Sequence, residues 1–145
     1  MKTAIVYYSA HHGNTRKLLD AIAEKHEVDL IDVTKQSGAN LSEYDRIGLA
    51  SGIYYTSFAK QLLDFARERL PEGKDVFYIC THGAPKGNFL KAVREIAEAK
   101  RCKELGSYHC QGYDTFGPFK LLGGIAKGHP TEAETAAAVA FYEKL

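Results

Sequence analysis

Residues 4–23 read AIVYYSAHHGNTRKLLDAIA, and this stretch decides the expected fold. An apolar run at Ala4–Val6 passes through a polar turn containing Gly13, and helical spacing begins at Asn14. A buried strand that turns directly into a helix leaves the first N–H groups of that helix without partners, and the helix dipole is positive at that end. The stretch therefore predicts an anion-binding loop after the first strand.

The residues around this turn support the same hypothesis. Arg16 and Lys17 occupy the first helical turn, where the dipole disfavours cations, and a bound dianion would reverse that penalty. Ser9, Asn14 and Thr15 add side-chain donors. The same residue types are common in ordinary turns, and the several glycines of Walker or dinucleotide loops are missing. A mononucleotide-type phosphate loop and an ordinary turn therefore both remain open.

Composition narrows the class of protein. The 145 residues carry a formal net charge of +1, with both signs mixed along the expected helices, which argues against a nucleic-acid-binding face. The sequence has no apolar run of membrane-spanning length, and its first residues are typical of a strand rather than a signal peptide. Its 3 cysteines lack CxxC spacing, so neither a zinc site nor a disulfide framework is expected. We expect one cytoplasmic domain, residues 1–145, with neither nucleic-acid nor membrane partners.

Apolar runs and helical spacings alternate along the chain. Strands are expected at residues 3–8, 28–33, 46–50, 75–80 and 107–111. Helices are expected to begin near Asn14, Ser57, Asn88 and Thr131, with Ser57 as an N-cap and Thr131–Glu134 as a capping box. Residues 34–42 are too rich in Gly and Ser for a helix. This alternation predicts an α/β fold: a doubly wound, five-stranded parallel sheet of order 2-1-3-4-5 with helices on both faces.

Ligands of such sheets bind beyond the carboxyl ends of the strands. The loops expected there are residues 9–15, 51–57 and 81–88. In the second loop, Tyr54 and Tyr55 either cover a flat aromatic ligand or simply pack on the following helix. Gly and Pro residues shape the third loop into a stiff turn whose N–H groups can face a heterocycle edge. The three loops together predict a site for a phosphate joined to a flat polar ring system.

The motifs Tyr8-Ser9…Gly13-Asn14-Thr15, Ser51-Gly52-Ile53-Tyr54-Tyr55 and Thr81-His82-Gly83-Ala84…Gly87-Asn88 carry a family resemblance. The chain resembles the flavodoxin-like FMN-binding proteins over essentially its whole length. The resemblance implies that the first loop wraps the FMN phosphate and that the other two loops flank the isoalloxazine ring. The implied phosphate contacts are Ser9, His11, His12, Gly13, Asn14 and Thr15. The implied ring contacts are Ser51, Gly52, Ile53, Tyr54 and Tyr55 on one side and Thr81, His82, Gly83 and Ala84 along the edge.

The sequence departs from the family pattern in three places. The phosphate loop is one residue longer than usual and places His11 and His12 before Gly13. The net charge of +1 differs from the strongly acidic charge of typical flavodoxins, which steers them to basic redox partners. Residues 112–130 form a long irregular segment after the fifth strand, bordering either the flavin or a partner surface.

Two function classes follow from the resemblance. The first is an FMN-binding electron carrier that exchanges electrons with redox protein partners. The alternative is an FMN-dependent NAD(P)H oxidoreductase that acts on a quinone or a similar acceptor, so the sequence leaves open whether the protein is itself an enzyme. A third, weaker hypothesis is a flavodoxin-like module that has lost its flavin and serves as a binding partner.

Overall fold

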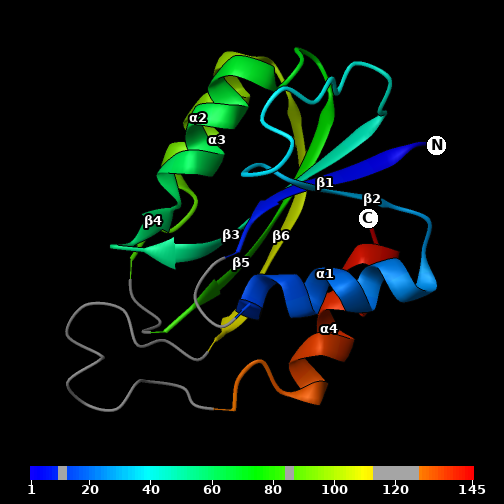
Figure 1. Cartoon of the computed structure of the whole chain (residues 1–145), viewed down its shortest axis with the longest axis vertical. Coiled ribbons are helices and arrows are strands. Elements are labelled where there is room, and N and C mark those ends of the chain that lie inside the picture. Colours follow the sequence, from blue (N-terminus) through cyan, green and yellow to red (C-terminus); the bar gives the residue numbers. More distant parts are fainter. Residues whose placement is uncertain (10–12, 84–86, 113–127) are drawn as a thin grey trace.

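The computed structural model describes residues 1–9, 13–83, 87–112 and 128–145. Strands and helices alternate through these residues (Figure 1). The strands are β1 (Thr3–Tyr8), β2 (Asp29–Asp32), β3 (Arg46–Tyr54), β4 (Ser57–Phe58), β5 (Asp75–His82) and β6 (Lys103–Gln111). The helices are α1 (Asn14–Lys25), α2 (Lys60–Arg69), α3 (Lys91–Ala99) and α4 (Glu132–Glu143).

The sheet has the predicted topology. Its main strands lie in the order β2-β1-β3-β5-β6, and all four pairings between them are parallel. The chain therefore leaves β1 for β2 on one side and continues to β3 on the other, so the switch point lies between β1 and β3. The short strand β4 is an addition to the prediction, and it pairs antiparallel with the far end of β3.

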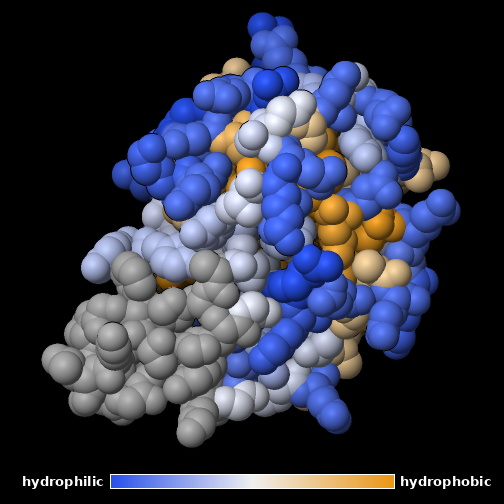
Figure 2. All heavy atoms as spheres, viewed as in Figure 1, coloured by the Kyte–Doolittle hydropathy of each residue, from blue (hydrophilic) through white to orange (hydrophobic). Residues whose placement is uncertain are grey.

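Helices cover both faces of the sheet. α1 and α4 pack together on one face, and α2 and α3 pack together on the other (Figure 1). Because side chains alternate along a strand, Ile5 and Phe77 enter the core under α1 and α4, whereas Val6 and Tyr78 enter the core under α2 and α3. Apolar surface also reaches the outside beside the edge strand β2 (Figure 2), where half-buried Leu30 extends the α1/α4 core.

An irregular crossover, residues 33–45, connects β2 to β3 without a helix, as the sequence predicts. It nevertheless contributes to the core under α2 and α3, where Val33, Leu41 and Tyr44 are buried. The crossover is tied to the start of β1, because the Lys2 N–H donates to the Asp45 carboxylate at 2.7 Å. The turns of this crossover thus cover the core with a few buried apolar side chains, where a helix would otherwise pack.

The predicted start of α2 at Ser57 is wrong. Ser57 belongs to β4, and the helix begins at Lys60. The hydroxyl that secures this start comes from Ser51, which accepts from the Ala59 N–H at 3.0 Å and donates to the Gly52 carbonyl at 2.6 Å. A serine on the preceding strand therefore replaces the local N-cap, and the β3–β4 hairpin takes up the intervening residues.

The predicted capping box of α4 is confirmed. The Thr131 hydroxyl accepts from the Glu134 N–H at 3.2 Å, and the Glu134 carboxylate accepts from the Thr131 N–H at 2.8 Å. His129 Nδ1 lies 2.5 Å from the same carboxylate. Partial burial raises the pKa of Glu134, but the contacts with Thr131 and His129 outweigh burial and leave the pKa below its ordinary value.

Thr131→Ala is expected to lower the free energy of unfolding by about 1 kcal/mol, because the Glu134 N–H loses its acceptor. Chemical denaturation measures the change. Ser37→Ala, at an exposed position in the irregular crossover, is the matched control and leaves stability unchanged. An equal effect of the two substitutions would contradict the contribution of the capping box.

Candidate functional site

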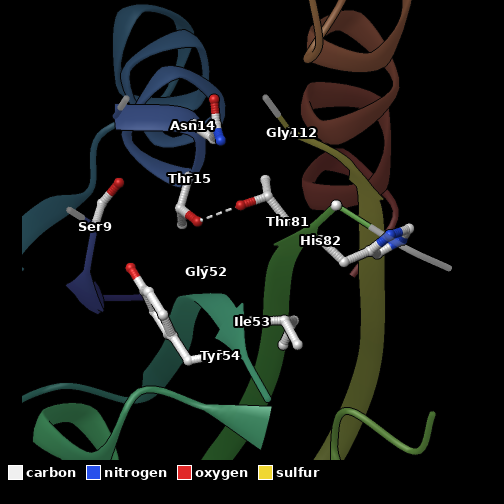
Figure 3. A pocket seen from close by; sticks show the side chains of 10 residues that line it. Ser9, Asn14, Thr15, Gly52, Ile53, Tyr54, Thr81, His82 and Gly112 are labelled. Atoms are coloured by element: carbon white, nitrogen blue, oxygen red, sulfur yellow. Dashed lines mark hydrogen bonds between the residues drawn. The ribbon is translucent and has the colours of Figure 1, made fainter. Parts of the chain in front are cut away.

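A pocket lies where the carboxyl ends of β1, β3, β5 and β6 meet the start of α1 (Figure 3). This is the edge at which doubly wound sheets bind ligands. Its lining residues are Ser9, Asn14, Thr15, Gly52, Ile53, Tyr54, Thr81, His82, Gly83 and Gly112.

The start of α1 forms the polar end of the pocket. Gly13 precedes the helix in a left-handed conformation, with φ 64°, and Asn14 and Thr15 follow as buried residues. Thr15 is 1% exposed, and its hydroxyl lies 2.9 Å from the Thr81 hydroxyl. This hydrogen bond joins the start of α1 to the end of β5. The Ser9 hydroxyl accepts from the Arg16 N–H at 3.2 Å. Hydroxyls and helix N–H groups thus converge on one small volume.

Arg16 lies beside this end of the pocket but outside the lining. Its guanidinium donates to Asp20 one turn along α1 at 2.6 Å and also to the Tyr7 hydroxyl. The Asp20 contact raises the pKa of Arg16, whereas burial raises the pKa of Tyr7. α1, which the structure describes in full, has no acidic residue in its first turn, so the helix N-terminus keeps its positive character.

The far end of β3 forms the apolar wall. Tyr54 points toward Ser9 and Thr15 (Figure 3), and its ring lies close over Gly52, where an added Cβ would sit 3.4 Å from the Tyr54 hydroxyl. The ring also meets Tyr8 edge-to-face at a centroid distance of 6.0 Å. Tyr55 is 78% exposed and starts the left-handed turn of the β3–β4 hairpin. Tyr54 and Tyr55 are therefore separated: one lines the pocket and the other faces outward.

The structure brings most of the predicted site residues together. Those in the lining are Ser9, Asn14, Thr15, Gly52, Ile53, Tyr54, Thr81, His82 and Gly83. Gly13 shapes the turn that leads to Asn14, and Ser51 is buried outside the lining, where its hydroxyl contacts Gly52 and Ala59. His11, His12 and Ala84 lie outside the described residues.

Gly112 is a lining residue that the sequence analysis did not predict. Its N–H donates to the His82 carbonyl at 2.9 Å, and a Cβ built on it would lie 2.6 Å from Asn14 Nδ2. Only a residue without a side chain therefore fits between the end of β6 and the start of α1. Its position directly after the last strand was the available signal, because the carboxyl end of that strand reaches the same edge.

His82 closes the pocket at the side of β6. It is 5% exposed, its ring stacks on Phe89 at a centroid distance of 5.0 Å, and its Nε2 lies 3.0 Å from His109 Nδ1. Burial lowers the pKa of His82, and the neighbouring His109 lowers it further. A lowered pKa makes the imidazole of His82 predominantly neutral at pH 7.

Residues 1–9, 13–83, 87–112 and 128–145 offer neither a metal site nor a membrane-spanning helix. This part of the chain contains no cluster of three or more His, Cys, Asp or Glu side chains arranged to hold a metal ion. None of its helices combines the length and the apolar character needed to span a bilayer.

The strand order and the pocket at the switch point define a doubly wound α/β protein with a candidate ligand site at the carboxyl edge of its sheet. The family model of the flavodoxin domain matches residues 5–107. An uncharacterized protein from Methanocaldococcus jannaschii is 36% identical over 147 residues, covering 100% of this chain and 98% of that relative. The chain therefore belongs to the flavodoxin domain family.

Solved structures share the fold at low sequence identity. Oxidised flavodoxin 1 from Bacillus cereus matches with a TM-score of 0.70 at 14% identity, covering 99% of this chain and 96% of that chain. The Fusobacterium nucleatum flavodoxin bound to flavin mononucleotide matches with a TM-score of 0.64 at 13% identity, covering 99% and 98%. These matches confirm the predicted flavodoxin-like sheet with helices on both faces.

Proposed function

We propose that this protein binds FMN in the pocket between α1 and the β3–β4 hairpin and carries electrons between redox protein partners. One observation carries the proposal: a polar helix N-terminus and an aromatic wall line the same pocket. FMN joins a phosphate to a flat ring, so its two ends match these two surfaces. The flavodoxin of Fusobacterium nucleatum, whose structure contains flavin mononucleotide, supports the same ligand.

The start of α1 suits the phosphate. Thr15 and Ser9 would donate hydroxyl hydrogen bonds, and the first N–H groups of the helix would add charge-assisted ones. Gly13 allows a phosphate to approach the backbone closely, because glycine has no side chain to cover the turn. The space beside it is open: a Cβ built on Gly13 would meet no described atom within 4 Å. The first turn of α1, fully described, has no acidic residue that would repel a dianion.

The β3 end suits the ring system. Ile53 and Tyr54 offer apolar and aromatic surface, and Gly52 and Gly83 line the same pocket without side chains of their own. Bound FMN would supply the electron-transfer chemistry, and the protein would supply position and electrostatics. Tyr54 would exclude water from one face of the ring, and aromatic contact there would disfavour added negative charge on it.

An absorption spectrum of the purified protein, followed by titration with FMN, tests the proposal. We expect flavin bands in the purified protein, or saturable quenching of flavin fluorescence when FMN is added. Riboflavin, which lacks the phosphate, is the matched control ligand and should bind more weakly. Absence of any flavin binding would contradict the proposal.

The alternative, an FMN-dependent NAD(P)H oxidoreductase acting on a quinone or similar acceptor, rests on one observation. The net charge of +1 lacks the acidic field with which flavodoxins steer basic partners. Steady oxidation of NADH or NADPH by the FMN-loaded protein with a quinone, and with no added reductase, would favour this alternative over the carrier.

Thr15→Val is expected to weaken FMN binding by about 1–2 kcal/mol, because the variant keeps the shape and loses a hydroxyl donor. Titration calorimetry measures the change. Thr3→Val is the matched control, since Thr3 is also buried but lies at the opposite end of β1 from the pocket. Equal FMN affinities for Thr15→Val and the wild-type protein would remove Thr15 from the phosphate contacts.

A further inference from the structure

Exposed basic residues occupy the first turns of three helices beside the pocket. These residues are Arg16 and Lys17 in α1, Lys60 in α2 and Lys91 in α3, and we call them the basic rim. The first turns of the three helices, which the structure describes in full, contain no acidic residue. The helix dipole disfavours cations at this end of a helix. Helix stability therefore does not account for the basic rim, whereas binding of an anionic partner would.

The basic rim lies around the pocket on both faces of the sheet. α1 begins at the lining residue Asn14 on one face, whereas α2 and α3 lie on the other face (Figure 1). The start of α2 is joined to the end of β3, because the Ala59 N–H donates to the Ser51 hydroxyl at 3.0 Å. The segment leading to α3 is joined to the end of β5, because Phe89 stacks on the lining residue His82. Each of the three helix starts is therefore attached to an element that lines the pocket.

Ion pairs within these helices leave the positive charges nearest the pocket. Arg16 contacts Asp20 at 2.6 Å, and Lys60 contacts Asp64 at 2.7 Å. In each pair the carboxylate lies one turn further from the helix start than the cation does. The other two members of the basic rim take part in no ion pair within the described part of the chain. The surface around the helix starts is therefore positive.

Acidic residues at the same edge of the sheet lie beside the outer strands. Glu132 and Glu134 occupy the first turn of α4, which follows β6, and Glu134 is engaged in the capping box. At the end of β2, Asp32 is offset by the exposed Lys35. Among the described residues, the positive surface is therefore confined to the starts of α1, α2 and α3.

An exposed aromatic ring lies beside the basic rim. Tyr55, directly after the lining residue Tyr54, is 78% exposed at the turn of the β3–β4 hairpin. Tyr55 and Thr56 both have left-handed backbone, with φ 47° and 66°, which is unfavourable for a residue branched at Cβ such as Thr. The turn packs tightly against the segment before α3, where a Cβ built on Gly87 would lie 3.1 Å from Thr56 Cβ. The fold thus maintains a strained turn that presents an aromatic side chain to solvent, as expected of a binding surface.

We propose that the basic rim and Tyr55 form a docking surface for an acidic redox protein. The proposal rests on the proposed function, because the docked protein exchanges electrons with the FMN bound in the pocket. One electron leaves the reduced partner and enters the bound group, or passes the opposite way, and no atom is transferred. The sheet separates the cations of α1 from those of α2 and α3, so one small anion does not contact them all, whereas carboxylates spread over a protein surface can. Tyrosine is enriched among the residues that anchor protein interfaces.

Nuclear magnetic resonance of the ¹⁵N-labelled protein tests docking without FMN. The probe is a plant-type 2Fe–2S ferredoxin, which is strongly acidic, and cytochrome c is the basic contrasting probe. We expect ferredoxin to perturb the amide signals of the basic rim and the hairpin, and to do so less as the salt concentration rises. Absence of this perturbation, or the same perturbation by cytochrome c, would overturn the proposal. Perturbation of these signals by NADPH but not by ferredoxin would overturn it in favour of a nucleotide site.

Paired substitutions test the charges. Lys60→Gln combined with Lys91→Gln is expected to weaken ferredoxin binding by about threefold to tenfold, because two exposed ion pairs are lost. Lys25→Gln combined with Lys103→Gln is the matched control and leaves the affinity unchanged, because both lysines are exposed at the opposite edge of the sheet. Tyr55→Asn, which suits the left-handed backbone, should also weaken binding. Equal ferredoxin affinities of the two paired variants would contradict the docking surface.

Small oxidants of opposite charge test the same surface in the FMN-loaded protein. The reduced protein is mixed with ferricyanide, an anion, or with tris(phenanthroline)cobalt(III), a cation. We expect added salt to slow the reaction with ferricyanide and to speed the reaction with the cobalt complex. If FMN binds and salt has the opposite effects, the docking proposal fails and the proposed function stands. If FMN does not bind, the proposed function fails and the docking proposal fails with it.

Discussion

Gly48→Ala is expected to lower the free energy of unfolding by about 3 kcal/mol, through overpacking of the core. Gly48 lies in β3 between β1 and β5, opposite Ile5 and Phe77. A Cβ built on Gly48 would lie 2.5 Å from Phe77 Cζ and 3.1 Å from Ile5 Cγ1. Both neighbours are fully buried, so neither ring nor alkyl chain can move aside without disturbing the core under α1 and α4.

Chemical denaturation of four variants tests this explanation: Gly48→Ala, Phe77→Leu, the double variant and Gly38→Ala. Gly38→Ala is the control, because its Cβ would meet only the Arg69 side chain, at 3.8 Å, and stability should stay the same. Adding Phe77→Leu to Gly48→Ala should recover part of the loss, since the leucine side chain leaves the volume of the ring edge empty. Strict additivity of the two losses would contradict the predicted clash.

Gly112→Ala is expected to weaken FMN binding by about tenfold to a hundredfold, or about 1.4–2.8 kcal/mol. The new Cβ would overlap Asn14, with 2.8 Å to both Cβ and Cγ of that side chain. Asn14 is the first residue of α1, so any shift that relieves the overlap moves the N–H groups proposed to bind the phosphate. A small loss of stability accompanies the change, because Gly112 lies past the end of β6 rather than inside the core.

Gly106→Ala provides the control for the same strand. Its Cβ would lie 3.2 Å from Phe141 Cε1, on the α4 side and away from the pocket. We expect a modest loss of stability with no change in FMN affinity, as measured by fluorescence titration. Equal FMN affinities for Gly112→Ala and the wild-type protein would show that the start of α1 does not contact the ligand.

The parts of the fold that local sequence controls were predictable. α1 begins where the pattern indicates, at Asn14, because the polar turn before it is a local signal. The α4 capping box is local as well. The strand order followed from the alternation of strands and helices, since crossovers between parallel strands have one preferred hand.

The features that the sequence could not predict depend on residues far apart in the chain. Ser57 has the local pattern of an N-cap, but the hydroxyl that secures α2 comes from Ser51 across the hairpin. Gly112 is explained only by its contact with Asn14, at the other end of the sequence. Residues 53 and 54 extend β3 beyond its predicted end because β4 pairs with them.

The contact between His82 and His109 is another feature that depends on residues far apart in the chain. Of these two histidines, the sequence analysis placed only His82 in the site. Their contact depends on the register between β5 and β6, in which His109 lies beside Cys80 and His82 beside Gln111. Strand order alone does not specify that register, so the 3.0 Å contact becomes visible only in three dimensions.

The irregular crossover between β2 and β3 also makes this fold suited to circular permutation. The Arg46 N–H donates to the Lys2 carbonyl, and Arg46 and Leu145 line one surface depression, so the chain termini lie near each other. A short linker can join them there. New termini can open at Ser37, in an exposed turn that contributes nothing to the described pocket lining. The permuted chain would carry its new ends in this crossover, apart from the residues that line the pocket.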